Sequence, residues 1–273
     1  MAMELSVWSG YYASLSPEDA AVRFLKNGIS TMELSTEHGQ MLIDRSEDVV
    51  KTGAEFRAYL ASVGMSVPQG HLLLSCRLVS NPDAVSVIKR WIDLYEAVGV
   101  KCMVLHIDNY NALAEAPLEE VHAKNAERLL EIAEHIKEKE IFICLENLVR
   151  VGADSADVLI SLIERLGSDR FGITLDTGHL NIVKTTTQRE FILRAGKHLR
   201  ALHIDDNEGA KDQHMMPFGR GQVDFCEVVS ALREIGYEGP FNFEIPGESR
   251  CPIEIRDAKL AFVKASYDYL MSI

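Results

Sequence analysis

Residues 140–176 read EIFICLENLVRVGADSADVLISLIERLGSDRFGITLD, and this stretch decides the fold. It contains an apolar run at 140–146, a segment with helical periodicity at 156–166, and a second apolar run at 172–176. Short apolar runs are typical of buried strands, and a longer periodic segment between two of them is typical of a helix that packs on the sheet. The stretch therefore predicts two parallel strands joined by a helical crossover.

The same alternation of short apolar stretches and longer helical patterns continues through the rest of the chain. The predicted strands cover residues 4–8, 31–35, 66–70, 101–107, 140–146, 172–176, 200–205 and 241–245. The predicted helices cover residues 17–26, 84–98, 118–138, 156–166, 224–235 and 254–271. Eight such units favour a (β/α)₈ TIM barrel, which needs about 250 residues. We therefore expect one α/β domain over residues 1–273.

An open, doubly wound sheet is the competing fold. Its usual dinucleotide fingerprint is a strand followed by G-x-G-x-x-G, and this sequence lacks it. The stretch from Gly219 to Gly221 comes late in the chain and has no third glycine. The barrel is therefore the favoured architecture.

Composition argues against several classes of partner. The formal net charge is −13, from 41 acidic and 28 basic residues, and no Lys/Arg-rich run interrupts this acidity. Tight binding to a phosphate backbone needs clustered cations, so we expect no nucleic-acid partner. No apolar run approaches the roughly 18 residues of a membrane span. We therefore expect no membrane association.

The location of the protein is predicted from its N-terminus and its cysteines. The N-terminus lacks the basic and long apolar regions of a secretory signal. The five cysteines are odd in number, widely spaced and mostly in apolar surroundings, which is typical of reduced core residues. Both observations predict a cytoplasmic protein.

Polar side chains follow most of the predicted strands. In a (β/α)₈ barrel the carboxyl ends of the strands converge on one mouth, so these side chains are expected to lie close together. The side chains at or just beyond strand ends are His71, His106, Asp108, Glu146, Asn147, Asp176, His179, His203, Asp205, Asp206 and Glu244, and the loop after the seventh strand adds Asp212 and His214.

Four of these side chains come from four successive strands and are expected to surround one divalent ion. They are Glu146, Asp176, His203 and Glu244. Carboxylate oxygens and imidazole nitrogens are ligands that Mn²⁺, Mg²⁺, Co²⁺, Fe²⁺ and Zn²⁺ accept. Three carboxylates and one imidazole form a hard ligand set, which favours Mn²⁺, with Mg²⁺, Co²⁺ or Zn²⁺ as alternatives.

Five motifs, in this order and spacing, resemble the xylose isomerase-like barrels. This family includes sugar (phosphate) isomerases and epimerases, inosose dehydratases and the endonuclease IV type of AP endonuclease. The motifs are CLEN at 144–147, LDTGH at 175–179, LHIDD at 202–206, DQH at 212–214 followed by PFGRGQVD at 217–224, and FE at 243–244. The resemblance implies a metal held by the four ligands above, with Glu146 and Glu244 also acting as the acid/base pair. Relatives in this family are often dimers or tetramers, which implies a possible homo-oligomer.

The expected chemistry is proton transfer next to a carbonyl group. A metal stabilises the resulting enediolate as a Lewis acid, and two glutamates remove and return the proton. This predicts a metal-dependent isomerase or epimerase that acts on a small ketose, keto-inositol or related carbohydrate. Loss of a hydroxyl at the same site would instead make a dehydratase or lyase on an oxidised sugar or inosose.

Seven further residues are candidates for substrate binding. They are His179, His106, His71, His214, Asp212, Trp8 and Arg220. Trp8, like Tyr11 and Tyr12 after it, is placed either to stack on the apolar face of a sugar ring or to pack at the barrel rim. Glu33, inside the second predicted strand, points into the barrel or toward the mouth, where it would orient polar groups.

One departure from the family bears on the substrate. Ketose 3-epimerases of this family place an arginine a few residues beyond the strand-seven histidine, whereas Asp205, Asp206, Asn207, Glu208 and Gly209 follow His203 here. This departure argues against a plain free-ketose epimerase. Arg220 and Arg250 are the few cations near the mouth, so a neutral substrate such as a free sugar, keto-inositol or oxidised glycoside fits better than a phosphate ester.

Two alternatives belong to other functional classes. In endonuclease IV-like members the counterparts of His71, His106 and Glu146 bind a second zinc, and those of His179, Asp212 and His214 bind a third. A trinuclear zinc phosphodiesterase is therefore an alternative, although such an enzyme needs cationic loops to grip DNA. A non-catalytic sugar-binding subunit is the other alternative. Loss of a metal ligand would be its signature, and none of the four is missing.

Overall fold

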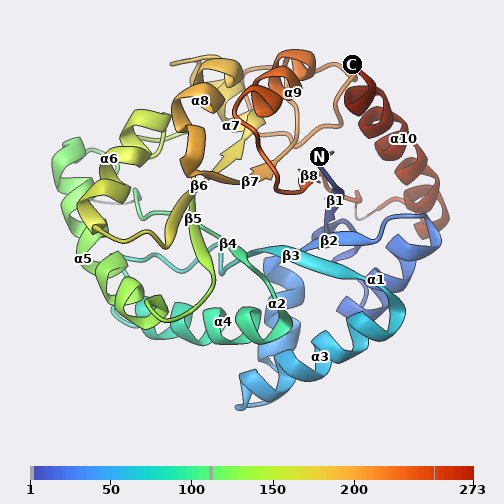
Figure 1. Cartoon of the computed structure of the whole chain (residues 1–273), viewed down its shortest axis with the longest axis horizontal. Helices are drawn as coiled ribbons and strands as arrows, with labels where there is room; N and C mark the ends of the chain where they lie inside the picture. The colour runs from blue at the N-terminus through green and yellow to red at the C-terminus, as the bar shows by residue number, and fades with distance from the viewer. Residues whose placement is uncertain (1–2, 111–112, 249) are drawn as a thin grey trace.

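Eight parallel strands form the centre of the structure, a computed structural model that describes residues 3–110, 113–248 and 250–273. Their order in the sheet is β7-β6-β5-β4-β3-β2-β1-β8. The strands are β1 (Leu5–Trp8), β2 (Thr31–Leu34), β3 (Ser66–His71), β4 (Cys102–Leu105), β5 (Phe142–Glu146), β6 (Phe171–Asp176), β7 (Leu199–His203) and β8 (Phe241–Phe243). Figure 1 shows them as a central ring with helices around it.

The ring closes between β7 and β8 through a single residue, Ile204. The amide of Ile204 donates to the carbonyl oxygen of Asn242 at 2.8 Å, and the amide of Glu244 donates to the carbonyl oxygen of Ile204 at 3.1 Å. This bridge joins the two ends of the sheet as parallel neighbours. The prediction of a (β/α)₈ barrel is confirmed, and all eight predicted strands are present with each end within two residues of its expected position.

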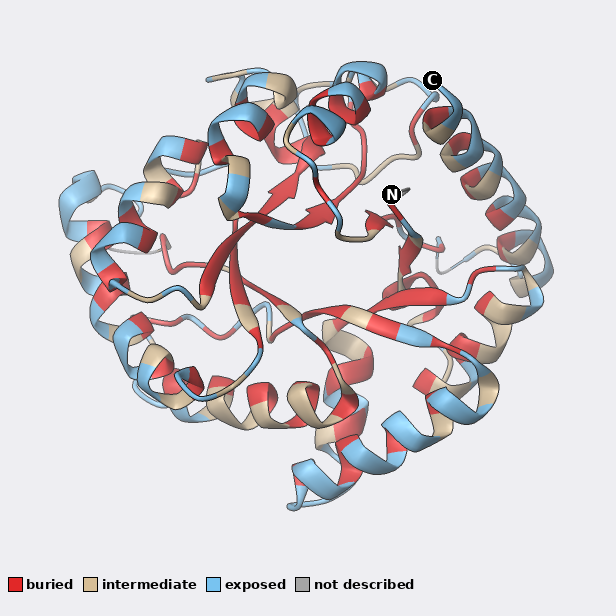
Figure 2. Cartoon of the chain, viewed as in Figure 1, coloured by how far each residue is buried: buried red, intermediate tan, exposed pale blue. Residues whose placement is uncertain are grey.

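The helices lie outside the ring and bury one face against it (Figure 2). They are α1 (Pro17–Lys26), α2 (Thr36–Ile43), α3 (Val49–Val63), α4 (Ala84–Val98), α5 (Leu118–Ile136), α6 (Ala156–Leu166), α7 (Thr177–Val183), α8 (Gln188–Ala195), α9 (Phe225–Glu234) and α10 (Ile253–Ser272), with short 3₁₀ turns η1 (Ser9–Tyr12) and η3 (Gly196–His198). The six predicted helices are confirmed. Helices α2, α3, α7 and α8 are additional to the prediction.

Two of the additional helices begin directly at the end of a strand, and their first residues are held by capping side chains. The Ser35 hydroxyl accepts from the amide of His38 to start α2, and the Asp176 carboxylate accepts from the amide of His179 to start α7. A capping oxygen satisfies a backbone N–H that has no partner within the helix. Helices α2 and α7 therefore begin at the barrel mouth, beside the strand ends.

Two expectations about packing are settled by the structure. Tyr12 is fully buried and its hydroxyl donates to the Asp257 carboxylate at 2.5 Å, so this ring packs in the barrel and does not stack on a substrate. Cys226 is exposed on α9, whereas Cys76 and Cys144 are buried as expected. Tyr12 is the last residue of η1 and Cys226 the second residue of α9. Element ends are the positions where sequence periodicity is least informative.

Among the described residues, every helix is too short or too polar to span a lipid bilayer.

Candidate metal centre

The carboxyl ends of the strands surround a cavity of about 290 Å³. We call it the metal cavity, after the candidate metal ligands beside it. Its lining residues are Trp8, Glu37, His71, Leu74, His106, Glu146, His179, Asp212, Gln213, His214, Glu244 and Pro246. They come from the ends of β1, β3, β4 and β5, from the first turns of α2 and α7, and from the loops that follow β3, β7 and β8. The polar side chains expected at the mouth therefore do meet around one space.

Four side chains offer ligand atoms that all lie within 4.8 Å of one another. They are the four predicted ligands, Glu146, Asp176, His203 and Glu244. Their exposed fractions are only 1%, 0%, 0% and 8%. The Oδ2 atom of Asp176 is buried without a hydrogen-bond partner, which is costly for a carboxylate unless a cation is nearby. The donor set and this unpartnered oxygen both fit a divalent ion.

Each of these side chains is placed by a strand end. Glu146 and Asp176 are the last residues of β5 and β6, and His203 is the last residue of β7. Asp176 and His203 are paired in register between β6 and β7, which brings their side chains to the same level of the barrel. Glu244 follows β8 directly. The parallel register therefore accounts for the convergence.

Glu33 holds the imidazole of His203 from inside the barrel. The Nε2 of His203 lies 3.0 Å from Oε1 of Glu33, and Asn242 donates to Oε2 of Glu33 at 2.5 Å. The Nδ1 of His203 faces the other way, 3.0 Å from the Glu244 carboxylate. A carboxylate that accepts from one ring nitrogen fixes the tautomer and leaves the other nitrogen available as a ligand. Glu33 therefore orients His203, as expected for a polar residue inside the second strand.

Mutual electrostatics keep the two candidate catalytic glutamates ionised. Burial opposes ionisation of Glu146, but His106 and His203 outweigh it and hold the pKa of Glu146 well below its usual range. Burial also opposes ionisation of Glu244, and His203 outweighs it to lower the pKa of Glu244 to about 2. Asp176 behaves differently, because burial and the neighbouring Asp205 raise its pKa. Glu146 and Glu244 are therefore anionic beside His203, whose own pKa they raise despite its burial. A divalent ion would take the place of the His203 proton in balancing these carboxylates.

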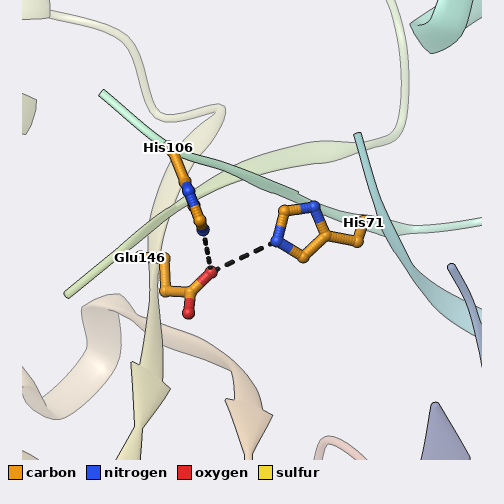
Figure 3. Close-up of side chains that lie close together, drawn as sticks. All are labelled: His71, His106 and Glu146. Carbon is orange, nitrogen blue, oxygen red and sulfur yellow. Dashed lines mark hydrogen bonds and ion pairs between the residues drawn. The ribbon is translucent and has the colours of Figure 1, made fainter. Parts of the chain in front are cut away.

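Two histidines point at the outer oxygen of Glu146 (Figure 3). The Nε2 of His106 lies 2.7 Å from Oε2 of Glu146, and the Nε2 of His71 lies 3.4 Å from the same oxygen. The Nδ1 of His71 donates to the carbonyl oxygen of Leu72 at 2.7 Å. These three side chains form a second group whose ligand atoms all lie within 4.8 Å of one another.

A third group lies on the other side of Asp176. The ligand atoms of Asp176, His179 and His214 also lie within 4.8 Å of one another. Asp212 contacts both histidines, at 3.3 Å from Nε2 of His179 and 3.1 Å from Nε2 of His214. The Nδ1 of His179 donates to the carbonyl oxygen of Asn147 at 2.8 Å. This set can bind a polar substrate group or a further ion.

Asp205 was expected at the barrel mouth but was given no role as a ligand or substrate-binding residue, and the structure places it beside this third group. It is fully buried, and its Oδ2 lies 2.9 Å from Nδ1 of His214. Its approach requires glycine at position 178, because a Cβ there would lie 1.9 Å from Oδ1 of Asp205. The glycine of the LDTGH motif was the available sequence signal, since a glycine beside a site often marks close approach of another group.

The structure brings ten of the eleven predicted site residues together and leaves one apart. Trp8, His71, His106, His179, Asp212 and His214 line the metal cavity with Glu146 and Glu244, and Asp176 and His203 lie beneath it. The Arg220 side chain is 77% exposed and lies 3.5 Å from the Glu208 carboxylate, outside the described lining of this cavity. Glu37 and Gln213 line it without having been predicted.

A family model and three individual proteins are similar to this chain. The model, described as a xylose isomerase-like TIM barrel, matches residues 21–266. Uncharacterized protein y4fM of Sinorhizobium fredii (strain NBRC 101917 / NGR234) is 32% identical over 171 residues, which are 60% of this chain and 53% of that protein. The chain therefore spans about half the length of this relative.

Two sugar epimerases or epimerase-like proteins match over most of the chain. The L-ribulose 3-epimerase of Methylomonas sp. (strain DH-1) is 25% identical over 251 residues, covering 87% of this chain and 81% of that protein. The crystal structure of a D-tagatose 3-epimerase-like protein has a TM-score of 0.77 and 22% identity, covering 99% of this chain and 98% of that chain. This structural likeness concerns the fold.

Proposed function

The chain belongs to the xylose isomerase-like TIM barrel family, and we propose that it is a metal-dependent sugar isomerase or epimerase. The observation that carries the proposal is the group of Glu146, Asp176, His203 and Glu244, whose ligand atoms lie within 4.8 Å of one another at the barrel mouth. The similarity to an L-ribulose 3-epimerase over 87% of the chain supports the same class of reaction.

The proposed roles follow from the positions of the two glutamates. A divalent ion held by the four ligands would act as a Lewis acid on a carbonyl and its neighbouring hydroxyl. Glu146 comes from β5 and Glu244 from the end of β8, with β6 and β7 between them, so they approach a bound substrate from different sides. One removes the proton next to the carbonyl and the other returns a proton. Return to the opposite face of the same carbon gives an epimer, and return to the adjacent carbon gives an isomer.

The lining of the metal cavity supports a substrate without a phosphate group. Its described lining residues include no lysine or arginine. The Arg220 guanidinium, the predicted substrate cation, lies beside Glu208 instead. Phosphate recognition in proteins relies on such cations or on helix N-termini. The N-termini of α2 and α7 at the mouth are already capped by Ser35 and Asp176. A neutral ketose, keto-inositol or oxidised glycoside is therefore the proposed substrate class.

The reaction class is tested by proton exchange with solvent, which does not require the product to be known. The metal-loaded protein is incubated in D₂O with L-ribulose, D-tagatose, a keto-inositol and a 3-keto-glucoside, and NMR follows deuterium entering at the carbon next to the carbonyl. We expect metal-dependent exchange in at least one of them. Elimination of water from the keto-inositol would support the lyase alternative, and no exchange in the whole panel would contradict the proposal.

A trinuclear phosphodiesterase is the second candidate, favoured by one observation. The Nδ1 atoms of His71 and His179 donate to backbone carbonyl oxygens, which leaves each Nε2 directed at a carboxylate of the site. This arrangement is typical of metal-ligating histidines. The formal charge of −13 opposes binding of DNA.

Metal content distinguishes the two candidates. Elemental analysis of the purified, unchelated protein is expected to give about one divalent ion per chain, because the four-ligand group is the most buried of the sets. Two or three zinc ions per chain, together with cleavage of abasic DNA, would replace the carbohydrate proposal by the phosphodiesterase. No bound metal after supplementation with Mn²⁺, Co²⁺ or Zn²⁺ would contradict both.

Replacing Glu33 by glutamine is expected to weaken Mn²⁺ binding by about 10- to 100-fold, the usual effect of losing a residue that orients a ligand. The substitution keeps the size of the side chain but removes the charge beside Nε2 of His203. Calorimetric titration with Mn²⁺ measures the affinity. Glu4→Gln is the matched control, because Glu4 is exposed and precedes β1. Equal affinities in the two variants would show that Glu33 does not position the ligand.

A further inference from the structure

A second cavity, of about 490 Å³, lies against the metal cavity. It is bounded by the loop that follows β7, the segment after β8, and one face of α10. Gln213, His214 and Pro246 line both cavities, so the two spaces share a wall beside the metal centre. The second cavity is larger than the first, and the proton-transfer chemistry proposed above makes no use of it.

The lining of this second cavity is mainly apolar. Its apolar side chains include Met215, Met216, Ile245, Phe262 and Val263. Phe262 is 47% exposed, which is unusual for so large an apolar side chain that faces a concave surface. Methionine side chains are flexible and polarisable, so a wall that contains two of them adapts to apolar groups of different shapes.

The charges around this second cavity are already paired within the chain. The Nζ atom of Lys259 lies 2.7 Å from the Glu248 carboxylate, and the Arg220 guanidinium lies 3.5 Å from the Glu208 carboxylate. Each cation is therefore offset by a carboxylate, and the two pairs give the rim of the cavity no net positive charge. The chemistry of this cavity therefore favours an apolar group over a phosphate or carboxylate.

We propose that the second cavity binds an apolar group attached to the substrate, while the carbohydrate portion occupies the metal cavity. This inference rests on the proposed function and narrows its substrate class to carbohydrates that carry an aryl or alkyl substituent, such as glycosides with an apolar aglycone. The shared wall places the junction between sugar and substituent beside His214. His214 is well fixed for this role, because its Nδ1 lies 2.9 Å from Asp205 and its Nε2 lies 3.1 Å from Asp212.

A series of hydroxamates tests the proposal without knowledge of the natural substrate. The hydroxamate group chelates a divalent ion, and its tail is varied from methyl to 4-phenylbutyl. Calorimetry on the Mn²⁺-loaded protein measures the affinity of each compound, from acetohydroxamate to the phenyl-tailed one. We expect the phenyl-tailed compound to bind at least about tenfold more tightly than acetohydroxamate, because the tail buries apolar surface in the second cavity.

Substitutions in the second cavity should weaken binding of the phenyl-tailed hydroxamate but not of acetohydroxamate. Phe262→Ala and Met216→Ser are expected to remove most of the affinity gained from the phenyl tail and to leave acetohydroxamate binding within about twofold of wild type. Both side chains are at least partly exposed, so the fold is expected to tolerate the changes. Tyr269→Ala is the matched control, because Tyr269 is a 51% exposed aromatic residue on α10 outside the described lining of the cavity. It should retain the full gain.

The outcomes separate this inference from the proposed function. If acetohydroxamate does not bind at all in the presence of Mn²⁺, the metal site itself is wrong. If it binds but the phenyl tail adds nothing, or the gain survives in both cavity variants, the second cavity is not a substrate subsite. A second copy of the chain is the other possible occupant of this cavity, and light scattering on the same samples tests for it. A dimer that dissociates in Phe262→Ala but not in Tyr269→Ala would assign this surface to chain–chain contact and overturn the inference.

Discussion

The Glu146→Gln variant is expected to lose at least about 10³-fold in kcat, within the range that a positioned acid or base contributes to proton transfer. Glutamine has nearly the same shape and can still accept a hydrogen bond from His106, which lies 2.7 Å from the Glu146 carboxylate. It cannot take up a proton from a carbon atom. The rate of deuterium exchange is measured at saturating Mn²⁺, so that weaker metal binding does not account for the loss.

Two companion variants make this result interpretable. Glu244→Gln should cause a loss of similar size, because the proposed reaction needs one group to remove the proton and another to return it. Glu238→Gln should leave the rate within about twofold of wild type, because Glu238 is exposed in the segment before β8 and lies outside the described lining of the metal cavity. Normal turnover of the Glu146 or Glu244 variant at saturating metal would rule out the paired-glutamate mechanism.

Chelation of the metal is expected to abolish activity and to lower the melting temperature by about 10 °C. A ligand at a thousand times its Kd stabilises the folded state by about 4 kcal/mol, and each kcal/mol shifts Tm by about 2–4 °C in a chain of this size. The physical reason is that the ion would bind the carboxylates of Glu146, Asp176 and Glu244 in the folded protein, where their ligand atoms already lie within 4.8 Å of one another, and would not find them together in the unfolded chain. Scanning calorimetry with EDTA and with excess Mn²⁺ measures the difference.

The Asp176→Asn variant provides the internal control for that shift. It removes one of the charges that the ion would neutralise and keeps an oxygen to accept from the amide of His179, which Asp176 now does at 2.6 Å. Its melting temperature should respond to Mn²⁺ by less than about half of the wild-type shift. A wild-type protein that melts at the same temperature with EDTA and with Mn²⁺ would argue that these residues hold no structural or catalytic ion.

The barrel was predictable because its strands and long helices repeat two simple periodicities. Helices α2 and α7 were harder to predict, because each starts at a strand end where the sequence also carries polar residues for the mouth. In the segment from Thr177 to Val183, the residues Gly178 and His179 serve the approach of Asp205 and the site rather than helix formation. Glycine lowers helix propensity, so the local signal is weak although the Asp176 cap forms the helix.

The residues of the candidate site that lie at strand ends could be predicted from the sequence, whereas the place of the loop residue Arg220 could not. Positions such as Glu146 and His203 follow from strand order alone, because a parallel barrel sends all its strand ends to one mouth. Arg220 follows from no such rule, since it lies in a loop whose course is set by local contacts. There the Asp206 carboxylate accepts from the amides of Gln222 and Val223 at 2.9 Å and 3.1 Å. Sequence spacing does not specify those contacts, and the direction of Arg220 could not be inferred from it.

The two cavities are formed by different elements of the barrel, and this affects how such a protein can evolve. The proposed metal ligands stand on the ends of β5 to β8, within the hydrogen-bonded frame of the barrel, whereas the second cavity is walled mainly by the loop after β7 and by α10. Substitutions at Met216 or Phe262 can alter what the outer wall accepts without disturbing strand register. Descendants of such a chain can thus acquire new substrates by drift in one loop and one helix face while inheriting an unchanged reaction centre, and their divergence should be concentrated there.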